Sequence, residues 1–268
     1  MESIQNPGGR SDASRTEGHQ PVADSFNPRD NHEPSRVDVW RMFDRIAPRY
    51  DLLNRLLSFR RDVAWRNRLC RHLPSGEHLS VLDLSTGTGD VLISLLTKSR
   101  RVSSAVGVDM SPVMLRLAAD KVAQRGLARR VTLLRADVRS LPFEDNSFDV
   151  VTIAFGIRNM PDVPAALQEM RRVLVRGGKV LILEFSLPRH PIVRRLYPFH
   201  LKGILPRVGA AVSGDGYAYR YLNETVQTFP CGEMFEQLMS QAGFAAVAST
   251  ELTFGVASIY EGVKAHHD

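Results

Sequence analysis

The stretch from Val81 to Asp90 constrains the fold of this chain more than any other part of the sequence. It begins as a short apolar run typical of a buried strand, breaks at Gly87 and Gly89, and continues as residues 91–98, whose apolar spacing predicts a helix. A strand, a glycine turn and a helix in this order form the nucleotide-binding corner of an open α/β sheet. The two glycines let the backbone approach a ligand closely, because a Cβ at either position would obstruct it.

An acidic residue follows the glycine turn at the distance that such a corner requires. Residues 104–108 have the apolar character of a second strand, and Asp109 comes directly after them, about twenty residues beyond the turn. A carboxylate at this place accepts hydrogen bonds from both ribose hydroxyls of an adenosine. A Gly-x-Gly alone is more often an ordinary tight turn, but together with the strand, the helix and Asp109 it predicts an adenosine-type cofactor.

Two classes of adenosine cofactor compete for this corner. A dehydrogenase usually has Gly-x-Gly-x-x-Gly, and Leu92 stands where the third glycine belongs. A class I methyltransferase has further ligand-facing acids at the ends of successive strands. Asp137, followed by Val138, comes after the expected strand at 131–135, where it can accept a hydrogen bond from an adenine amino group. The methyltransferase interpretation fits better.

Length, charge and cysteine content are those of an ordinary soluble protein with one sizeable core. The 268 residues contain no apolar run long enough to span a membrane, and no apolar secretion signal near the N-terminus. Cys70 and Cys231 lie far apart and predict two reduced thiols in a cytoplasmic protein, without a metal site. Of the net charge of +6, residues 1–36 contribute −2 (four arginines against six acids), which leaves +8 for the rest. A basic body suits nucleic acid, an anionic membrane surface, or solubility alone.

The chain divides into a tail, a helical cap and one α/β domain. Residues 1–36 are polar and rich in Pro, Gly and Ser, which predicts a disordered tail that is dispensable for catalysis. Residues 37–78 have apolar residues at helical spacing, interrupted by Pro48, which predicts a cap of several helices. Residues 79–264 alternate between strand and helix patterns, which predicts a mainly parallel sheet.

The patterns within the α/β domain place its elements. Ser111 and Asp162 are expected N-caps, and Gly177-Gly178 is expected to end a helix and turn into a strand. The closing pair of strands is joined tightly and is therefore expected to be antiparallel. We expect strands at 79–84, 104–108, 131–135, 149–155, 179–185, 244–250 and 252–263, and helices at 90–98, 112–125, 162–175 and 232–242.

Residues 187–230 interrupt the alternation and predict an inserted lid. Its first part, as far as residue 214, contains no acid and mixes basic with large apolar residues, among them Arg194, Arg195 and Lys202. Two interpretations stay open: a solvated helical linker, or a lid that contacts a hydrophobic substrate or a membrane surface.

Several stretches of this chain together resemble the menaquinone and ubiquinone biosynthesis C-methyltransferases, from about residue 37 to residue 264. The sequence departs from the family pattern at Asp62, where a histidine is usual, and at Ala154, where a serine is usual. The family often has Asn-Ala where Asp137-Val138 stands. The stretches that carry the resemblance are Tyr50–Phe59 with Trp65, Phe155–Asn159, Arg172–Gly178 continuing to Glu184–Ser186, and Tyr219–Leu222.

The resemblance implies a class I S-adenosylmethionine-dependent methyltransferase, Rossmann-like, with N-terminal helices and an inserted helical lid. The expected substrate is a prenylated quinol, foremost demethylmenaquinol in the last step of menaquinone biosynthesis. The alternative is 2-methoxy-6-polyprenyl-1,4-benzoquinol in ubiquinone biosynthesis. The residues expected to bind S-adenosylmethionine are Asp83, Gly87, Thr88, Gly89, Asp109, Asp137 and Val138.

The implied chemistry needs a group that favours the quinol as a phenolate, because a phenol carbon is a poor nucleophile while the neighbouring hydroxyl keeps its proton. Arg158 is the candidate, with a structural salt bridge as its alternative role, and Asn159 is expected to orient the hydroxyl. Tyr50 and Asp51 are expected to close over the methyl group. Weaker candidates are Asp90 as a water-mediated base or a helix cap, Tyr221 as a substrate contact and His200 as a base.

Two other function classes are weaker. A nucleic-acid amino-group methyltransferase would have an Asn/Asp-Pro-Pro-aromatic turn after the fourth strand, where this chain has Phe155–Asn159. A non-catalytic scaffold would not need Thr88, Asp109 and Arg158 together. We therefore expect no nucleic-acid partner, a cytoplasmic protein peripheral to the inner face of the membrane, and leave self-association open.

Overall fold

The computed structural model describes residues 39–188 and 216–266, with the side chains of residues 57 and 216–220 outside this description. The predicted tail at 1–36 lies outside this part of the chain, as do residues 189–215 of the predicted lid, with Arg194, Arg195, His200 and Lys202. The end of the predicted lid forms helix α8 (Gly216–Thr228).

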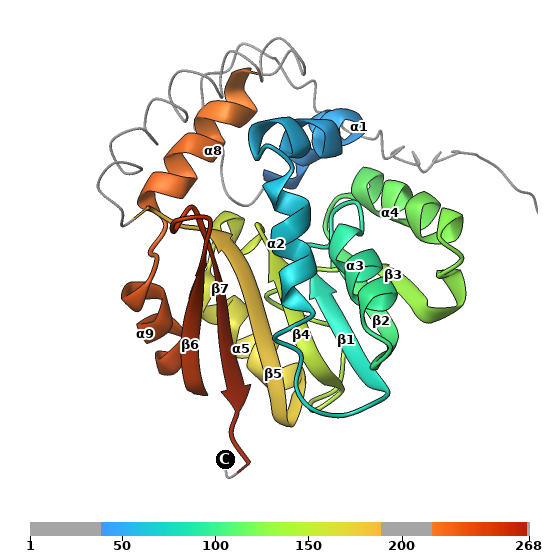
Figure 1. Ribbon diagram of the computed structural model, residues 1–268, viewed down its shortest axis with the longest axis vertical. Coiled ribbons are helices and arrows are strands. Elements are labelled where there is room, and N and C mark those ends of the chain that lie inside the picture. The colour runs from blue at the N-terminus through green and yellow to red at the C-terminus, as the bar shows by residue number, and fades with distance from the viewer. Residues whose placement is uncertain (1–38, 189–215, 267–268) are drawn as a thin grey trace, which may run out of the picture. The chain divides into compact units, whose positions relative to one another are not determined.

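A seven-stranded sheet is the centre of the described part, in the order β3-β2-β1-β4-β5-β7-β6 (Figure 1). The first five strands are parallel, and β7 pairs antiparallel with both β5 and β6. The predicted parallel sheet with a closing antiparallel pair is confirmed. The strands are β1 (Leu79–Leu84), β2 (Val102–Asp109), β3 (Val131–Arg135), β4 (Phe148–Ala154), β5 (Leu174–Phe185), β6 (Phe244–Leu252) and β7 (Ala257–Lys264).

Helices cover both faces of the sheet. Because side chains alternate along a strand, Val81 of β1 packs into one hydrophobic cluster, while Leu82 and Leu84 pack into another. The first cluster is completed by α2 (Arg61–Leu69), α3 (Asp90–Lys98) and α4 (Pro112–Gln124), and the second by α5 (Val163–Val173) and α9 (Glu233–Gln241). The 3-10 turns are η1 (Ala128–Arg130) and η2 (Ile157–Asn159).

The local signals for helix starts are confirmed. Ser111 precedes α4, and its side chain accepts a hydrogen bond from the Met114 N–H. Asp162 does the same for α5 with the Ala165 N–H. Both caps satisfy backbone donors that the first turn of a helix leaves without partners.

The predicted break at Pro48 is wrong, because α1 (Val39–Leu57) is one helix with Pro48 inside it. Proline removes one hydrogen bond from the ladder of a helix. The helix continues because apolar residues on both sides of the proline pack into one cluster with α8. The buried members of this cluster are Val39, Met42, Ile46, Leu53, Tyr221 and Val226.

The predicted turn at Gly177-Gly178 is also wrong, because β5 already begins at Leu174 and both glycines lie within it. The register shifts here: Phe148 of β4 pairs with Leu174, and Val150 pairs with Lys179. Gly177 has φ 77°, which a side chain tolerates poorly. The two glycines thus form an irregularity inside a long strand, and not the connection between helix and strand.

Candidate active site

The glycine turn after β1 is present as predicted, but glycine is required at its two positions for different physical reasons. Gly89 is the N-cap of α3 with φ 80°, and a Cβ there would lie 3.3 Å from Cβ of Ala118 on α4. It allows two helices to pack closely. Gly87 has φ 54° and an uncrowded Cβ position, and it lines a cavity. Of the two glycines, Gly87 is the one that borders the cavity, and its close approach to a ligand stays a prediction.

Asp109, the last residue of β2, ties the turn to the neighbouring strand. Its carboxylate accepts hydrogen bonds from the backbone N–H of Gly87 at 2.8 Å and of Ser111 at 2.9 Å. Burial raises the pKa of this carboxyl, and the backbone donors oppose that rise. Asp109 also lines the cavity, where each carboxylate oxygen still has a lone pair for a further donor.

The cavity has a volume of about 270 Å³ and lies at the carboxyl ends of β1, β2 and β4, the usual ligand site of an open α/β sheet. Helix α1 forms one wall with Val39, Trp40, Phe43 and Tyr50. Six of the predicted site residues line it: Tyr50, Gly87, Asp109, Asp137, Val138 and Asn159.

The sequence interpretation missed several lining residues. Ser85, Met110, Met114, Gly156 and Met160 all line the cavity. Most lie next to a predicted site residue or in the turn itself, so their position directly after a strand was a usable signal. The thioethers of Met110, Met114 and Met160 make much of this lining apolar, which suits the flat face of a base.

Asp137 lines the cavity with an arginine beside it. Arg139 holds it in an ion pair at 2.6 Å, and this contact keeps the pKa of Asp137 below its usual range. Val138 is buried next to it. The predicted adenine contact of this pair stays a prediction.

Asp83 is fully buried and does not line the cavity, and each of its carboxylate oxygens accepts one hydrogen bond inside the fold. Thr86 Oγ1 and Thr152 Oγ1 each donate to it at 2.6 Å. The structure therefore assigns Asp83 to the support of the turn from below, and its predicted contact with a cofactor finds no open surface here. Burial raises its pKa from 3.8 to about 7, against the two hydroxyl donors.

The raised pKa of Asp83 predicts a pH-dependent stability. Asp83 ionises near 3.8 when unfolded and near 7 when folded, so its contribution is complete below pH 3.8 and is lost as the pH rises through 7. Between pH 5 and pH 8 this loss is about 3 kcal/mol. Denaturant unfolding of Asp83→Asn at the two pH values should show a smaller decline than the wild type. The exposed Asp120→Asn is the control; an equal decline in both variants would contradict the assignment.

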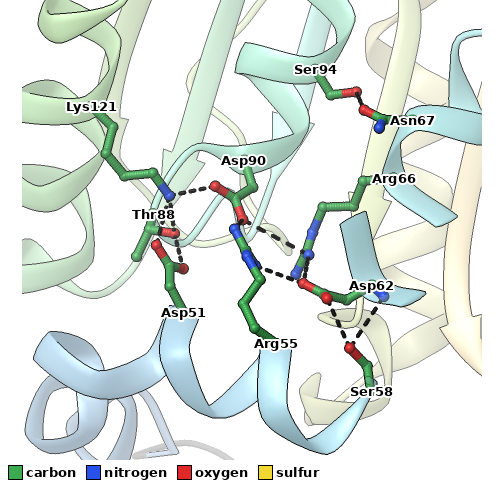
Figure 2. A network of polar contacts seen from close by, with 10 residues as sticks. All are labelled: Asp51, Arg55, Ser58, Asp62, Arg66, Asn67, Thr88, Asp90, Ser94 and Lys121. Carbon is green, nitrogen blue, oxygen red and sulfur yellow. Dashed lines mark hydrogen bonds and ion pairs between the residues drawn. The ribbon is translucent and has the colours of Figure 1, made fainter. Parts of the chain in front are cut away.

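A polar network joins α1 to the glycine turn (Figure 2). Thr88 Oγ1 donates to Asp51 Oδ1 at 2.7 Å. Lys121 Nζ of α4 donates to Asp51 Oδ2 at 2.8 Å, to Thr88 Oγ1 at 3.0 Å and to Asp90. Neither Asp51 nor Thr88 lines the cavity. Their geometry assigns them to holding α1 over the cavity, so the predicted contacts of Asp51 with the methyl group and of Thr88 with the cofactor stay predictions.

The network continues to α2 through Asp62. Arg55 Nη1 donates to Asp62 Oδ2 at 2.6 Å, Arg66 Nη1 donates to the same oxygen at 2.5 Å, and Arg55 Nη2 reaches Asp90 Oδ2 at 2.7 Å. Burial alone would raise the pKa of Asp90, but Lys121 and Arg66 outweigh it and lower that pKa. Asp90 is therefore a poor base, and since Gly89 is the N-cap, it is no cap either.

Arg158 in η2 is buried and ion-paired. Its Nη1 lies 2.7 Å from Glu184 Oε1 of β5 and donates to the Phe155 carbonyl at 2.6 Å. The salt bridge considered as its alternative role is thus present, and Arg158 itself does not line the cavity. Burial raises the pKa of Glu184, and the charge of Arg158 opposes the rise.

Two buried polar atoms of η2 have no hydrogen-bond partner among the described residues: Arg158 Nε and Asn159 Oδ1. A buried polar atom without a partner is costly, typically by about 1–3 kcal/mol. Asn159 lines the cavity directly. Tyr221, the weaker substrate candidate, is buried in the cluster between α1 and α8.

A comparison with known protein families shows to which family of enzymes this chain belongs. A model of the ubiE/COQ5 methyltransferase family matches residues 30–264. The chain belongs to this family. The methyltransferase matches a ubiquinone/menaquinone biosynthesis C-methyltransferase from Geobacter sulfurreducens with 46% identity, over 83% of this chain and 87% of the relative. It matches a demethylmenaquinone methyltransferase from Thermus thermophilus with 46% identity, over 82% of this chain and 99% of the relative.

Solved structures agree on the fold of this methyltransferase. A SAM-dependent methyltransferase from Thermotoga maritima is similar with a TM-score of 0.58 at 21% identity, over 84% of this chain and 99% of that one. The [4+2]-cyclase SpnF has the same TM-score of 0.58 at 17% identity, over 87% of this chain and 97% of that one. The predicted class I fold is confirmed. Since a cyclase shares it, the fold alone does not define the reaction.

Proposed function

We propose that this methyltransferase transfers the methyl group of S-adenosylmethionine to a ring carbon of prenylated demethylmenaquinol, the last step of menaquinone biosynthesis. The observation that carries the proposal is one cavity lined by Asp109 and Asp137 together with Tyr50 and Asn159, in a member of the ubiE/COQ5 family. The relative from Thermus thermophilus, matched over almost its whole length, favours the naphthoquinol. The name of the relative from Geobacter sulfurreducens also includes ubiquinone, so a methoxy-benzoquinol is the alternative substrate.

The residues of the cavity fit S-adenosylmethionine. Asp109 offers a carboxylate to the ribose hydroxyls, and Gly87 leaves room for the ligand at the turn. Met110, Val138 and Met160 offer apolar surface for the adenine, with Asp137 at hand for its amino group. When bound, this cofactor supplies an electrophilic methyl group on a sulfonium.

The chain's own residues then have to favour the phenolate form of the quinol, whose hydroxyl has a pKa of about 10 in water. Arg158 lies buried beside the lining residue Asn159, so the proposal includes a shift on quinol binding that brings the free Nε of Arg158 to the ring oxygen. Nε then donates to this oxygen as its negative charge develops, and Asn159 Oδ1 accepts from the hydroxyl while it is still protonated. Glu184 fixes the guanidinium through Nη1 and leaves Nε for the substrate. Tyr50, whose pKa burial raises despite the nearby Arg66 and Arg158, stays protonated and serves as a donor.

Transfer of a labelled methyl group tests the proposed function. The full chain is incubated with S-adenosylmethionine labelled in the methyl group and, separately, with demethylmenaquinol, the methoxy-benzoquinol and duplex DNA. The two quinols carry the same short prenyl tail. We expect label in the naphthoquinol product. Label in the benzoquinol alone would establish the alternative substrate, and label in neither quinol would overturn the proposal.

The cofactor part of the proposal predicts a defined role for Asp109. Replacing Asp109 by alanine removes the acceptor for two ribose hydroxyls, so calorimetry should show binding of S-adenosylmethionine weakened by about 1–3 kcal/mol. Asp145→Ala, at an acid whose side chain is 66% exposed, is the matched control and should bind as the wild type does. An unchanged affinity in Asp109→Ala would remove this residue from the cofactor site.

A further inference from the structure

Helix α1 has two faces of different chemistry. One face lines the cavity and carries the network to the glycine turn. Away from the cavity, every exposed residue from Val39 to Arg61 is an arginine, a large apolar residue or proline, among the side chains that the structure describes. These residues are here called the outer face of α1: Arg41, Arg45, Pro48, Arg49, Leu52 and Leu56 on the helix, with Phe59, Arg60 and Arg61 in the turn to α2 and at its start.

The outer face combines charge with exposed apolar surface. Leu52, Leu56 and Phe59 are 54%, 46% and 75% exposed. Arg45 and Arg49 precede Leu52 and Leu56 at the spacing of three and four residues that places side chains on one side of a helix. Single exposed leucines need no explanation, but three large apolar residues in a row of arginines form a continuous pattern.

The acids of the same segment are all turned inward. Asp44 accepts a hydrogen bond from Ser111 Oγ, Asp51 binds Thr88 and Lys121, and Asp62 is buried against its arginines. Within residues 39–62 the outer face therefore carries five arginines, and the acids of this segment lie on the other side. This separation of charges within the segment makes the outer face complementary to an anionic surface.

We propose that the outer face of α1 docks on the surface of an anionic lipid bilayer. A basic helix face with large apolar residues fits the boundary between headgroups and acyl chains, where arginines contact anionic headgroups and the apolar side chains enter the boundary. Nucleic acid would use the arginines but offers no apolar layer for Leu52 and Leu56. No helix in residues 39–188 or 216–266 is long and apolar enough to cross a membrane.

Docking of the outer face would bring the proposed enzyme to a membrane-borne substrate, but the docking itself does not depend on the proposed reaction. Because the inner face of α1 lines the cavity, the docked helix holds the cavity directly above the membrane layer that contains a prenylated quinol. The benefit to catalysis rests on the proposed substrate. The docking itself rests on the outer face alone, and it is measured without substrate or turnover.

The test is sedimentation of the full chain with vesicles of phosphatidylcholine alone and with about 30% phosphatidylglycerol, at several salt concentrations. We expect binding to the anionic vesicles, weakened by salt. Arg45→Gln with Arg49→Gln should lower the partition coefficient about 30-fold, since each basic residue at the surface contributes a factor of about five. Leu52→Gln with Leu56→Gln should lower it about tenfold. Thermal unfolding checks that each variant is folded.

Matched variants elsewhere in the chain distinguish binding through the outer face of α1 from non-specific effects of positive charge and exposed apolar surface. Arg125→Gln with Arg129→Gln removes the same charge at exposed positions after α4, and Met234→Gln removes a 60% exposed apolar residue of α9. Both should bind vesicles within about threefold of the wild type. Equal losses in these controls, or wild-type binding by folded α1 variants, would overturn the proposal. So would binding to duplex DNA without binding to vesicles.

Discussion

Replacing Arg158 by methionine should lower turnover on the quinol by about 10²–10³, the usual loss when one electrostatic donor is removed from a transition state. The physical reason is that the free Nε of this buried guanidinium is the cationic donor that the proposal assigns to the developing phenolate. The affinity for S-adenosylmethionine should stay unchanged, because the proposal assigns the cofactor to Gly87 and Asp109 at the glycine turn, and Arg158 makes its contacts with Glu184 and Phe155 instead. Steady-state kinetics on a short-tailed quinol and calorimetry with the cofactor measure the two effects.

The salt bridge to Glu184 requires a further variant for this prediction. Arg158→Met leaves the buried Glu184 without its cation, and a loss of turnover then has two explanations. Replacing both residues by methionine removes the unpaired charge, since an apolar pair often substitutes for a buried ion pair without loss of stability. If the folded double variant stays slow, the arginine acts on the substrate. Recovery of turnover would assign Arg158 to structure alone.

Replacing Asp62 by alanine should lower the free energy of unfolding by about 3–5 kcal/mol. Asp62 is only 3% exposed and accepts hydrogen bonds from Arg55, Arg66 and the Ser58 hydroxyl. Its removal leaves the buried Arg66 without its short contact, and a buried charge without a partner is far more costly than a lost surface pair. Denaturant unfolding without cofactor measures the change.

The matched control for Asp62 is an ion pair of the same chemistry at the surface. Asp137 pairs with Arg139, and their side chains are 34% and 38% exposed. Asp137→Ala should therefore cost less than about 1 kcal/mol. A loss of similar size in both variants would show that burial does not distinguish the two pairs and would contradict the prediction.

Tertiary contacts divide the predicted site residues into those that line the cavity and those that are buried behind it, although the two kinds look alike in sequence. Asp83 and Asp109 both lie in or at the end of an apolar strand beside the glycine turn. Asp83 belongs to the central strand β1, where Thr152 of the neighbouring β4 occupies one of its oxygens, whereas Asp109 opens to the cavity. Which acid faces the cavity depends on packing against a residue 69 positions away in the sequence, and no local pattern contains that information.

The sequence by itself determined the features that depend on neighbours along the chain. The strand, glycine turn and helix at 79–98, the caps at Ser111 and Asp162, and Asp109 at the end of β2 all follow from backbone geometry and short-range hydrogen bonds. The stretches at 50–59, 155–159, 172–186 and 219–222 together indicated the family, and the family match over residues 30–264 confirms it.

Only the tertiary structure decided how α1 works. Pro48 gave a correct local reason for a break, and packing against α8 overrode it. The contacts of Lys121 with Asp51 and Asp90 join residues 70 and 31 positions apart. No local pattern indicated that Asp51, expected over the methyl group, and Asp90, a candidate base or cap, share one cation. Burial and charge pairing between distant segments depend on the whole fold. In α1 they place the acids toward the interior and leave the arginines and leucines of the outer face exposed.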